Sequence, residues 1–174
     1  DEINSISQAQ VFISIRLGGY VVLAGNALGL SLLSQKLPKI EHFPARLKGH
    51  GAYHTPLVES HSQRAFQLIE PNLFASPQIP LIDGRGKIWL PRTSDANDLY
   101  TYTFGNQVVK PFDFTKAVAV GLKEFAPKKI VVLGPGNSLG APVGQILAAN
   151  RWQGILGKAD FKKRQQEKLF LEIA

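Results

Sequence analysis

The sequence predicts a mixed α/β fold, and three observations carry that prediction. A hydrophobic fraction of 44% over 174 residues is enough to bury a real core. Short runs of alternating or β-branched apolar residues are typical of strands, and they occur at 11–17, 20–25, 78–83 and 128–134. Longer segments place apolar residues at helical spacing, at 26–37, 56–70, 113–125 and 138–150. We therefore expect α/β or α+β architecture.

The first elements are predicted to form a hairpin followed by a helix. Residues 11–17 and 20–25 are the two strands, joined at Gly18-Gly19. Asn26 is a suitable N-cap for the helix that follows, and Pro38 ends it. Residues 46–54 are then predicted to be a third, short extended segment.

The middle of the chain begins with a strong helix-start signal at Thr55-Pro56. A hydroxyl side chain at the N-cap and proline at the first helical position are both favoured there. Pro71 ends this helix, and residues 78–83 form a strand that enters a turn at Asp83-Gly84. Residues 91–106 are polar and are predicted to be a loop.

The last third predicts helices around one buried strand. Phe114, Val118, Leu122 and Phe125 lie on one side of the helix predicted at 113–125. The β-branched residues of 128–134 predict a buried strand, and a helix follows over 138–150. Residues 157–174 are predicted to form a final amphipathic helix.

The composition restricts the classes of function. No apolar run reaches the ~18 residues that span a bilayer, and no secretory signal is evident, so we expect a cytoplasmic protein without membrane contact. The absence of cysteine excludes disulfides and Cys-based metal sites. The net charge of +7 comes from scattered Lys and Arg residues with one dense cluster at 158–168. A solvated basic helix explains that cluster better than nucleic-acid binding, although an acidic or phosphate-bearing partner is an alternative.

His54 has the most informative setting of the four histidines. It follows the segment 46–54 and precedes the N-terminus of a helix, whose dipole disfavours the imidazolium form. A neutral imidazole here could accept a proton, although an ordinary surface histidine is the simpler alternative. His50 and His54 have the i, i+4 spacing of a metal pair, but Gly49 and Gly51 argue against a helix there, so no metal is expected.

Several segments together resemble one enzyme family. They are "YVVLAGN", "GHGAYHTPLVES", "PLIDGRG", "NQVVKPFDFTKAV" and "VVLGPGNSLG", in that order. Between about residues 11 and 150 the chain resembles the C-terminal half of the malonyl-CoA:acyl-carrier-protein transacylases and the polyketide-synthase acyltransferases. The resemblance implies an acyl-carrier-protein S-acyltransferase, active in fatty-acid or polyketide biosynthesis. It would move an acyl group, with malonyl as the expected one, from coenzyme A to a phosphopantetheine thiol.

The resemblance also implies roles for three residues. His54 matches the family's catalytic base, and Gln107 matches the residue whose main-chain carbonyl accepts the other imidazole N–H. Tyr53 matches an aromatic residue that accompanies malonyl specificity. Glu59 and Asp113 are alternative partners for His54. No bound cofactor is expected, since the coenzyme A thioester is a substrate and the acyl carrier protein is the partner.

The resemblance implies two subdomains and a missing portion. Residues 1–49 match a ferredoxin-like small subdomain, and residues 50–174 match the C-terminal part of an α/β-hydrolase-like large subdomain with a basic tail. The family's G-H-S-x-G nucleophile segment and its carboxylate-binding Arg do not occur in this sequence, and Arg16 stands near a position where the family has Asn. A chain that begins at Asp1 is expected to be processed or truncated. Without the missing N-terminal half, we expect it to be inactive alone.

The loop "GPGNSLG" offers two other interpretations. Gly136-Asn137-Ser138-Leu139-Gly140 fits the G-x-S-x-G pattern of a serine hydrolase. Gly134, Gly136 and Gly140 approach a dinucleotide fingerprint, with Asp160 at the end of a possible second strand. The simplest interpretation is a structural turn in which Asn137 and Ser138 cap the next helix. A non-catalytic scaffold that docks a carrier protein is a further alternative.

Overall fold

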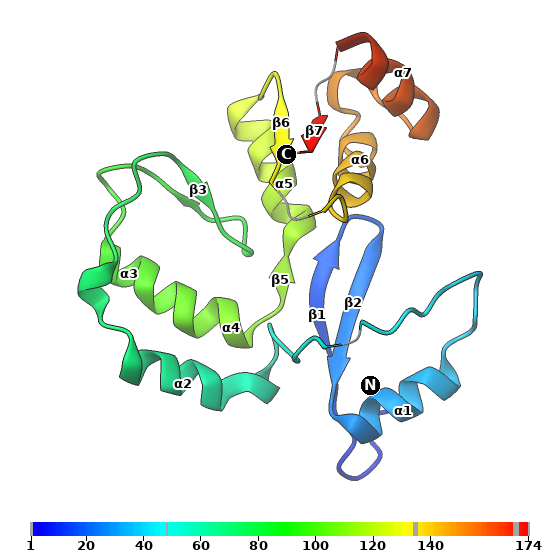
Figure 1. Ribbon diagram of the computed structural model, residues 1–174, viewed down its shortest axis with the longest axis vertical. Coiled ribbons are helices and arrows are strands. Elements are labelled where there is room, and N and C mark those ends of the chain that lie inside the picture. The colour runs from blue at the N-terminus through cyan, green and yellow to red at the C-terminus, as the bar shows by residue number, and fades with distance from the viewer. Residues whose placement is uncertain (1, 48, 134–135, 169–170, 174) are drawn as a thin grey trace. The chain divides into compact units, whose positions relative to one another are not determined.

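The computed structural model describes residues 2–47, 49–133, 136–168 and 171–173, and it has the predicted mixed α/β character (Figure 1). Its contacts define two compact units that interleave along the sequence. Unit 1 comprises Asp1–Ile15, Val22–Ser76 and Asp95–Phe112, and unit 2 comprises Arg16–Val21, Pro77–Ser94 and Asp113–Ala174. A subdomain boundary between residues 49 and 50 stays a prediction.

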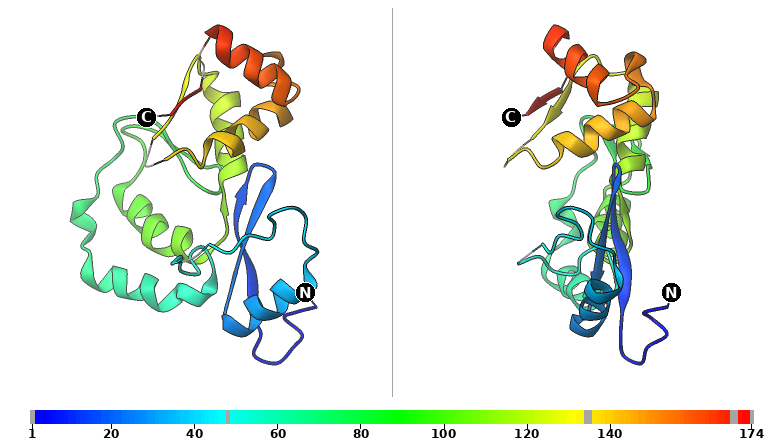
Figure 2. Two further views of the ribbon diagram at one scale, coloured as in Figure 1. Left: turned by 45° about the vertical axis from the view of Figure 1, so that its right-hand side comes forward. Right: turned by 90° about the vertical axis from the view of Figure 1, so that its right-hand side faces the viewer.

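The predicted hairpin and first helix are confirmed. The strands are β1 (Val11–Leu17) and β2 (Tyr20–Gly25), followed by helix α1 (Ala27–Lys36), as Figure 2 also shows. In the sheet, β1 lies between β2 and the short strand β5 (Phe112–Asp113). The Asn26 side chain accepts a hydrogen bond from the Gly29 N–H at 2.8 Å, which is the predicted N-cap. A Cβ at Gly29 would overlap the Gln10 carbonyl oxygen, so α1 packs directly on the backbone where β1 begins.

Unit 1 also contains several helices, some of them in a region predicted to be a loop. They are η1 (Pro56–Val58), α2 (Glu59–Leu68), η2 (Pro71–Leu73), α3 (Ala96–Thr101), the π-helix η3 (Tyr102–Asn106) and α4 (Gln107–Val109). The loop predicted at 91–106 is therefore wrong over 96–106, whereas 91–95 contain neither helix nor strand. Asp95 caps α3, and Tyr100 and Phe104 pack edge-on against Phe66 and Phe74, with ring centroids 5.4–6.3 Å apart. Aromatic burial outweighs the polar local sequence.

Near His54 one local prediction is wrong and another holds in part. The described part of 46–54 contains no strand, because Gly49 (φ +74°) and His54 (φ +61°) adopt left-handed backbone that a strand cannot include. Thr55 occupies the N-cap position as predicted, but its hydroxyl donates to the Ala52 carbonyl at 2.6 Å and makes no capping hydrogen bond. The helix consequently opens with the 3₁₀ turn η1, with Pro56 at its first position as predicted.

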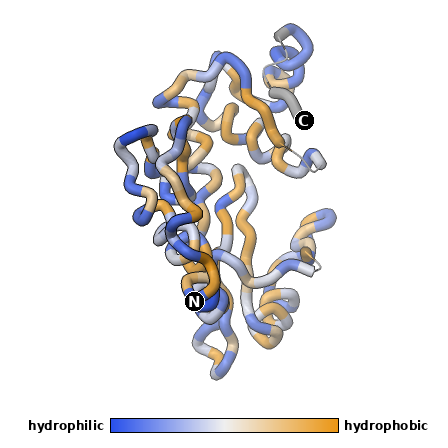
Figure 3. Tube along the Cα trace, turned by 60° about the vertical axis from the view of Figure 1, so that its left-hand side comes forward, coloured by the Kyte–Doolittle hydropathy of each residue, from blue (hydrophilic) through white to orange (hydrophobic). Residues whose placement is uncertain are grey.

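Unit 2 contains a small hairpin and a helical core. Its elements are β3 (Leu81–Ile82), β4 (Ile88–Trp89), α5 (Phe114–Phe125), β6 (Ile130–Val132), α6 (Gly140–Ala149), η4 (Trp152–Gly154), α7 (Lys158–Lys168) and β7 (Leu171–Ile173). The core is apolar and nearly solvent-free, and consists of Leu122, Val132, Val143, Ile146, Leu147 and Ile155. Asp113 caps α5 by accepting from the Lys116 N–H. Helix α7 is mostly hydrophilic (Figure 3).

The C-terminal segment differs from the prediction. The helix predicted over 157–174 ends at Lys168, and β7 then pairs in parallel with β6, with Ile130 opposite Leu171. Strand β6 is also less buried than expected, since Val131 is 50% exposed whereas Val132 is 6% exposed. Backbone pairing with a distant strand competes successfully with helix propensity in these last residues.

Candidate functional site

His54 sits at a strained turn in unit 1, between the irregular segment before it and the helical turn η1. Its φ of +61° is left-handed, a conformation that costs a non-glycine residue free energy and persists only where the surroundings impose it. The surroundings here include a hydrogen bond from the His54 backbone N–H to the Val108 carbonyl at 2.7 Å. Several other non-glycine residues share a left-handed φ, so it is the imidazole and its contacts, together with this turn, that make His54 the candidate site.

The His54 ring is oriented by two contacts. Its Nδ1 donates to the main-chain oxygen of Gln107 at 2.5 Å. Its face lies near the Phe112 ring, with centroids 5.4 Å apart and planes tilted by 43°. A carbonyl can only accept, so Nδ1 carries the hydrogen and Nε2 keeps its lone pair in the neutral ring. The contact that the family resemblance implies between His54 and Gln107 is present, and the catalytic roles of both residues stay predictions.

The two carbonyls that hold His54 are available because a helix ends there. Residues 96–109 form one helical run through α3, η3 and α4, and the last carbonyls of a helix have no partner within it. Lys110 is already extended, and Pro111 after it has no N–H to donate. The carbonyls of Gln107 and Val108 therefore accept the ring N–H and the backbone N–H of the same histidine. The π-helix η3 directly before α4 is a feature that frequently accompanies functional sites.

Buried hydroxyl groups hold the backbone next to His54. Ser14 of β1 is 5% exposed and donates to the Tyr53 carbonyl at 2.8 Å. Thr55 is fully buried and donates to the Ala52 carbonyl. Sequence reasoning missed the positioning role of Ser14, although its signal is a serine in the strand run "VFISIRL".

The other residues considered for the site have different surroundings. Tyr53 accepts the Ser14 hydrogen bond through its backbone carbonyl. The residue is 54% exposed, and its role in acyl specificity stays a prediction. The carboxylate of Asp113 accepts from Lys116 N–H at 2.8 Å and lies 4.0 Å from Arg16 Nε. Glu59 is exposed in the first turn of α2. The partner of Nδ1 is thus a carbonyl rather than either carboxylate.

The remaining histidines are exposed. His42 stacks beside Phe43, and His50 and His61 lie at the surface. Among the described residues, no group of three or more His, Asp or Glu side chains could hold a metal ion.

Ser138 lies in an exposed turn before α6. The left-handed residue in this turn is Gly136 (φ +80°), and Ser138 is not at a strained position of the kind that a nucleophile elbow requires. The predicted side-chain cap from Asn137 or Ser138 is wrong, since Leu139 is the N-cap and no side chain bonds there. Unit 2, which contains Ser138, has no histidine in its sequence.

The second strand that a dinucleotide-binding fold would need is not found at residues 152–160. Gly134 lies outside the described residues, and residues 152–160 contain the turn η4 and the start of α7 rather than a strand. The Asp160 carboxylate accepts from the Leu156 N–H at 3.0 Å within this helix start. Asp160 therefore has a local structural role.

The chain matches no known family model, no characterised protein and no solved structure. Within the described ranges, none of the helices is long and apolar enough to cross a bilayer.

Proposed function

We propose that this chain supplies the general base of an acyl-carrier-protein S-acyltransferase, with malonyl-CoA as the expected donor. The observation that carries the proposal is the Nδ1–carbonyl contact of His54 with Gln107 at 2.5 Å, together with the strained turn that presents the ring. The sequence segments that resemble the transacylases support it independently. Under this proposal the complete enzyme would contain the hydrolase-like and the ferredoxin-like subdomain.

The chemistry assigned to His54 is proton transfer at Nε2. As a serine hydroxyl attacks the thioester carbonyl, Nε2 takes the hydroxyl proton and then gives it to the departing coenzyme A thiolate. In the second half-reaction Nε2 takes the proton of the phosphopantetheine thiol, which attacks the acyl-serine, and returns it to the serine oxygen. The Gln107 carbonyl holds the Nδ1–H tautomer throughout, with less electrostatic help to the imidazolium than a carboxylate gives. The serine would come from a polypeptide segment outside these 174 residues.

The tautomer can be tested on this chain alone. Long-range proton–nitrogen NMR spectra are expected to show that the neutral ring of His54 carries its hydrogen on Nδ1 and a free lone pair on Nε2. The exposed His61 serves as the internal reference. Hydrogen on Nε2 of His54 would contradict the proposed base, because that nitrogen could not then accept a proton.

Activity is tested in a polypeptide that also contains the G-H-S-x-G segment, with malonyl transfer to a carrier protein as the readout. We expect His54→Ala to lower kcat/KM by about 10²–10⁴. Gln107→Ala should leave kcat/KM near the parent value, because only the backbone carbonyl of Gln107 contacts His54. His61→Ala is the matched histidine control. A loss of less than tenfold for His54→Ala refutes the assignment.

The charge distribution supports an acidic protein partner. Unit 2 carries 14 of the 20 Lys and Arg residues and 6 of the 13 Asp and Glu residues, a formal charge of +8, whereas unit 1, with 6 and 7, carries −1. A carrier protein that binds this chain without any acyl transfer, even when the serine segment is present, would favour a docking scaffold instead. Labelling by a fluorophosphonate that is lost in Ser138→Ala would favour a serine hydrolase.

A further inference from the structure

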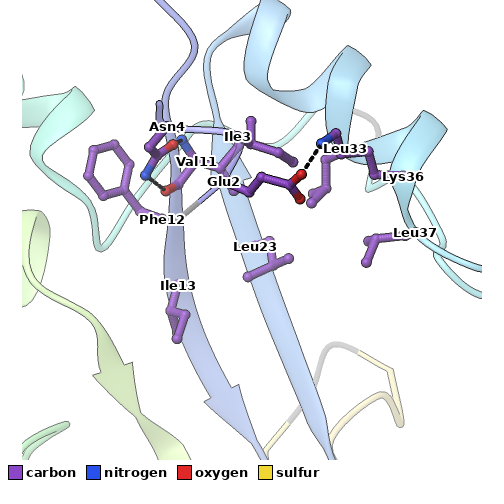
Figure 4. Close-up of a pocket in the computed structure, with 10 residues that line it drawn as sticks. All are labelled: Glu2, Ile3, Asn4, Val11, Phe12, Ile13, Leu23, Leu33, Lys36 and Leu37. Carbon is purple, nitrogen blue, oxygen red and sulfur yellow. Dashed lines mark hydrogen bonds and ion pairs between the residues drawn. The ribbon is translucent and has the colours of Figure 1, made fainter. Parts of the chain in front are cut away.

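Unit 1 contains a half-open apolar cavity between its N-terminal segment, the hairpin β1–β2 and helix α1. Its volume is about 570 Å³, which lies within the range of small-molecule sites in proteins. Figure 4 shows how side chains from the three elements surround it. The apolar lining includes Ile3, Val11, Ile13, Leu23, Leu33 and Leu37.

This cavity and the His54 turn involve different residues of unit 1. Val11, Phe12 and Ile13 of β1 line the cavity, whereas Ser14 of the same strand binds the Tyr53 carbonyl. Neither His54 nor Gln107 is among the residues that line the cavity. The cavity is therefore distinct from the candidate acyltransferase site.

One wall of the cavity is held in place by specific hydrogen bonds. The Asn4 side chain donates to the Val11 carbonyl at 2.9 Å and accepts from the Val11 N–H at 2.8 Å. This pairing fixes the N-terminal segment along the start of β1. The segment carries Ile3 into the lining and brings Glu2 to the end of α1.

The lining also contains a cationic side chain, Lys36, among its apolar residues. Lys36 Nζ lies 3.0 Å from Glu2 Oε1, and the two side chains are 42% and 82% exposed (Figure 4). An ion pair this exposed is weak, with an effect on an equilibrium of about two- to fivefold. A ligand carboxylate could therefore replace Glu2 as the partner of Lys36 at little cost.

We propose that this cavity binds a medium-chain fatty carboxylate. The hydrocarbon lies along the leucine side chains of β2 and α1, and the carboxylate displaces Glu2 from Lys36. The apolar lining provides affinity in proportion to buried chain length, and the single cation selects an anionic head group. The proposal does not depend on acyl transfer.

The binding test uses the 174-residue chain with octanoate, decanoate and decanol below their micellar concentrations. Calorimetry should show decanoate binding about 15-fold more tightly than octanoate, because two more methylenes are buried. Methyl resonances of Leu23, Leu33 and Leu37 should shift on binding, and those of Leu90 and Leu156 in unit 2 should not. No binding at millimolar ligand, or shifts confined to other leucines, would overturn the proposal.

Substitutions of the two charged lining residues, which leave the apolar lining intact, test the head-group contact. Lys36→Gln should weaken decanoate binding about two- to fivefold and leave decanol binding unchanged. Glu2→Gln removes the competitor for Lys36 and should tighten decanoate binding by a similar factor. Lys39→Gln is the matched control, because Lys39 is exposed and not part of the lining. Equal weakening by Lys36→Gln and Lys39→Gln, or no effect of Lys36→Gln, refutes the assigned head-group site.

Discussion

Asp83 is the buried carboxylate on which the hairpin β3–β4 depends, and replacing it by alanine should destabilise unit 2. The side chain is 3% exposed and accepts hydrogen bonds from three residues. Arg85 donates through its backbone N–H (2.8 Å) and its guanidinium (2.6 and 3.0 Å), Lys87 through its backbone N–H (3.1 Å), and Trp89 through Nε1 (3.1 Å). One carboxylate thus joins the turn to both strands.

The magnitude follows from what each donor loses in Asp83→Ala. The Trp89 residue is 2% exposed, so its indole N–H cannot readily turn to water, and a buried donor that loses its acceptor costs about 1–3 kcal/mol. The Lys87 N–H adds about 1 kcal/mol. The Arg85 side chain is 42% exposed and can be rehydrated, so its ion pair adds at most about 1 kcal/mol. We expect a total loss of about 3 kcal/mol.

Acid should remove the same contribution in the parent chain. Burial by itself raises the pKa of the Asp83 carboxyl, but the hydrogen bonds from Arg85 and Lys87 and the Arg85 charge outweigh it and hold the pKa below its usual value. The stabilisation is then fully present above the unfolded-state pKa of about 3.9 and is lost as pH falls through the lower folded-state pKa. Asp83→Ala should lack this acid-dependent part.

Urea unfolding followed by circular dichroism between pH 2 and pH 7 measures both effects. Tryptophan fluorescence adds a signal specific to unit 2, which contains both Trp89 and Trp152. Asp160→Ala is the matched control in the same unit, because the Asp160 carboxylate accepts the Leu156 N–H and loss of this one hydrogen bond should cost about 1 kcal/mol. A loss below 1 kcal/mol for Asp83→Ala at pH 7, or an unchanged pH profile, would show that this network is not stabilising.

Three further substitutions test unit 1. Gly29→Ala should destabilise by about 1–3 kcal/mol in urea titrations, because the new Cβ overlaps the Gln10 carbonyl, and a gain in stability would refute that close approach. Asn26→Ala should cost about 1 kcal/mol by loss of the N-cap bond to Gly29, measured in the same titrations, and an unchanged midpoint would contradict the cap. Ser14→Ala removes the hydrogen-bond donor to the Tyr53 carbonyl and should lower the free energy of unfolding by about 1–2 kcal/mol. Backbone amide exchange around Tyr53 should become faster, and unchanged exchange would mean that Ser14 does not hold this turn.

The sequence by itself determined the elements whose signals are local. The hairpin at Gly18-Gly19, the Asn26 cap, the proline at the start of η1 and the helix after Asp113 all form as predicted. In each case a few neighbouring residues supply both the preference and the hydrogen bond that satisfies it. The position of His54 before a helix start also made it the most informative of the four histidines, while its catalytic role came from the family resemblance and stays a prediction.

Only the tertiary structure decided where His54 finds its partner and how the chain ends. The helix before Gln107 was not predicted, since the aromatic packing that supports Tyr100 and Phe104 comes from Phe66 of α2 and from Phe74, some thirty residues away. The end of that helix leaves the two carbonyls that hold His54. Strand β7 likewise exists through pairing with β6. Such contacts depend on long-range packing, which a local pattern of residues does not contain.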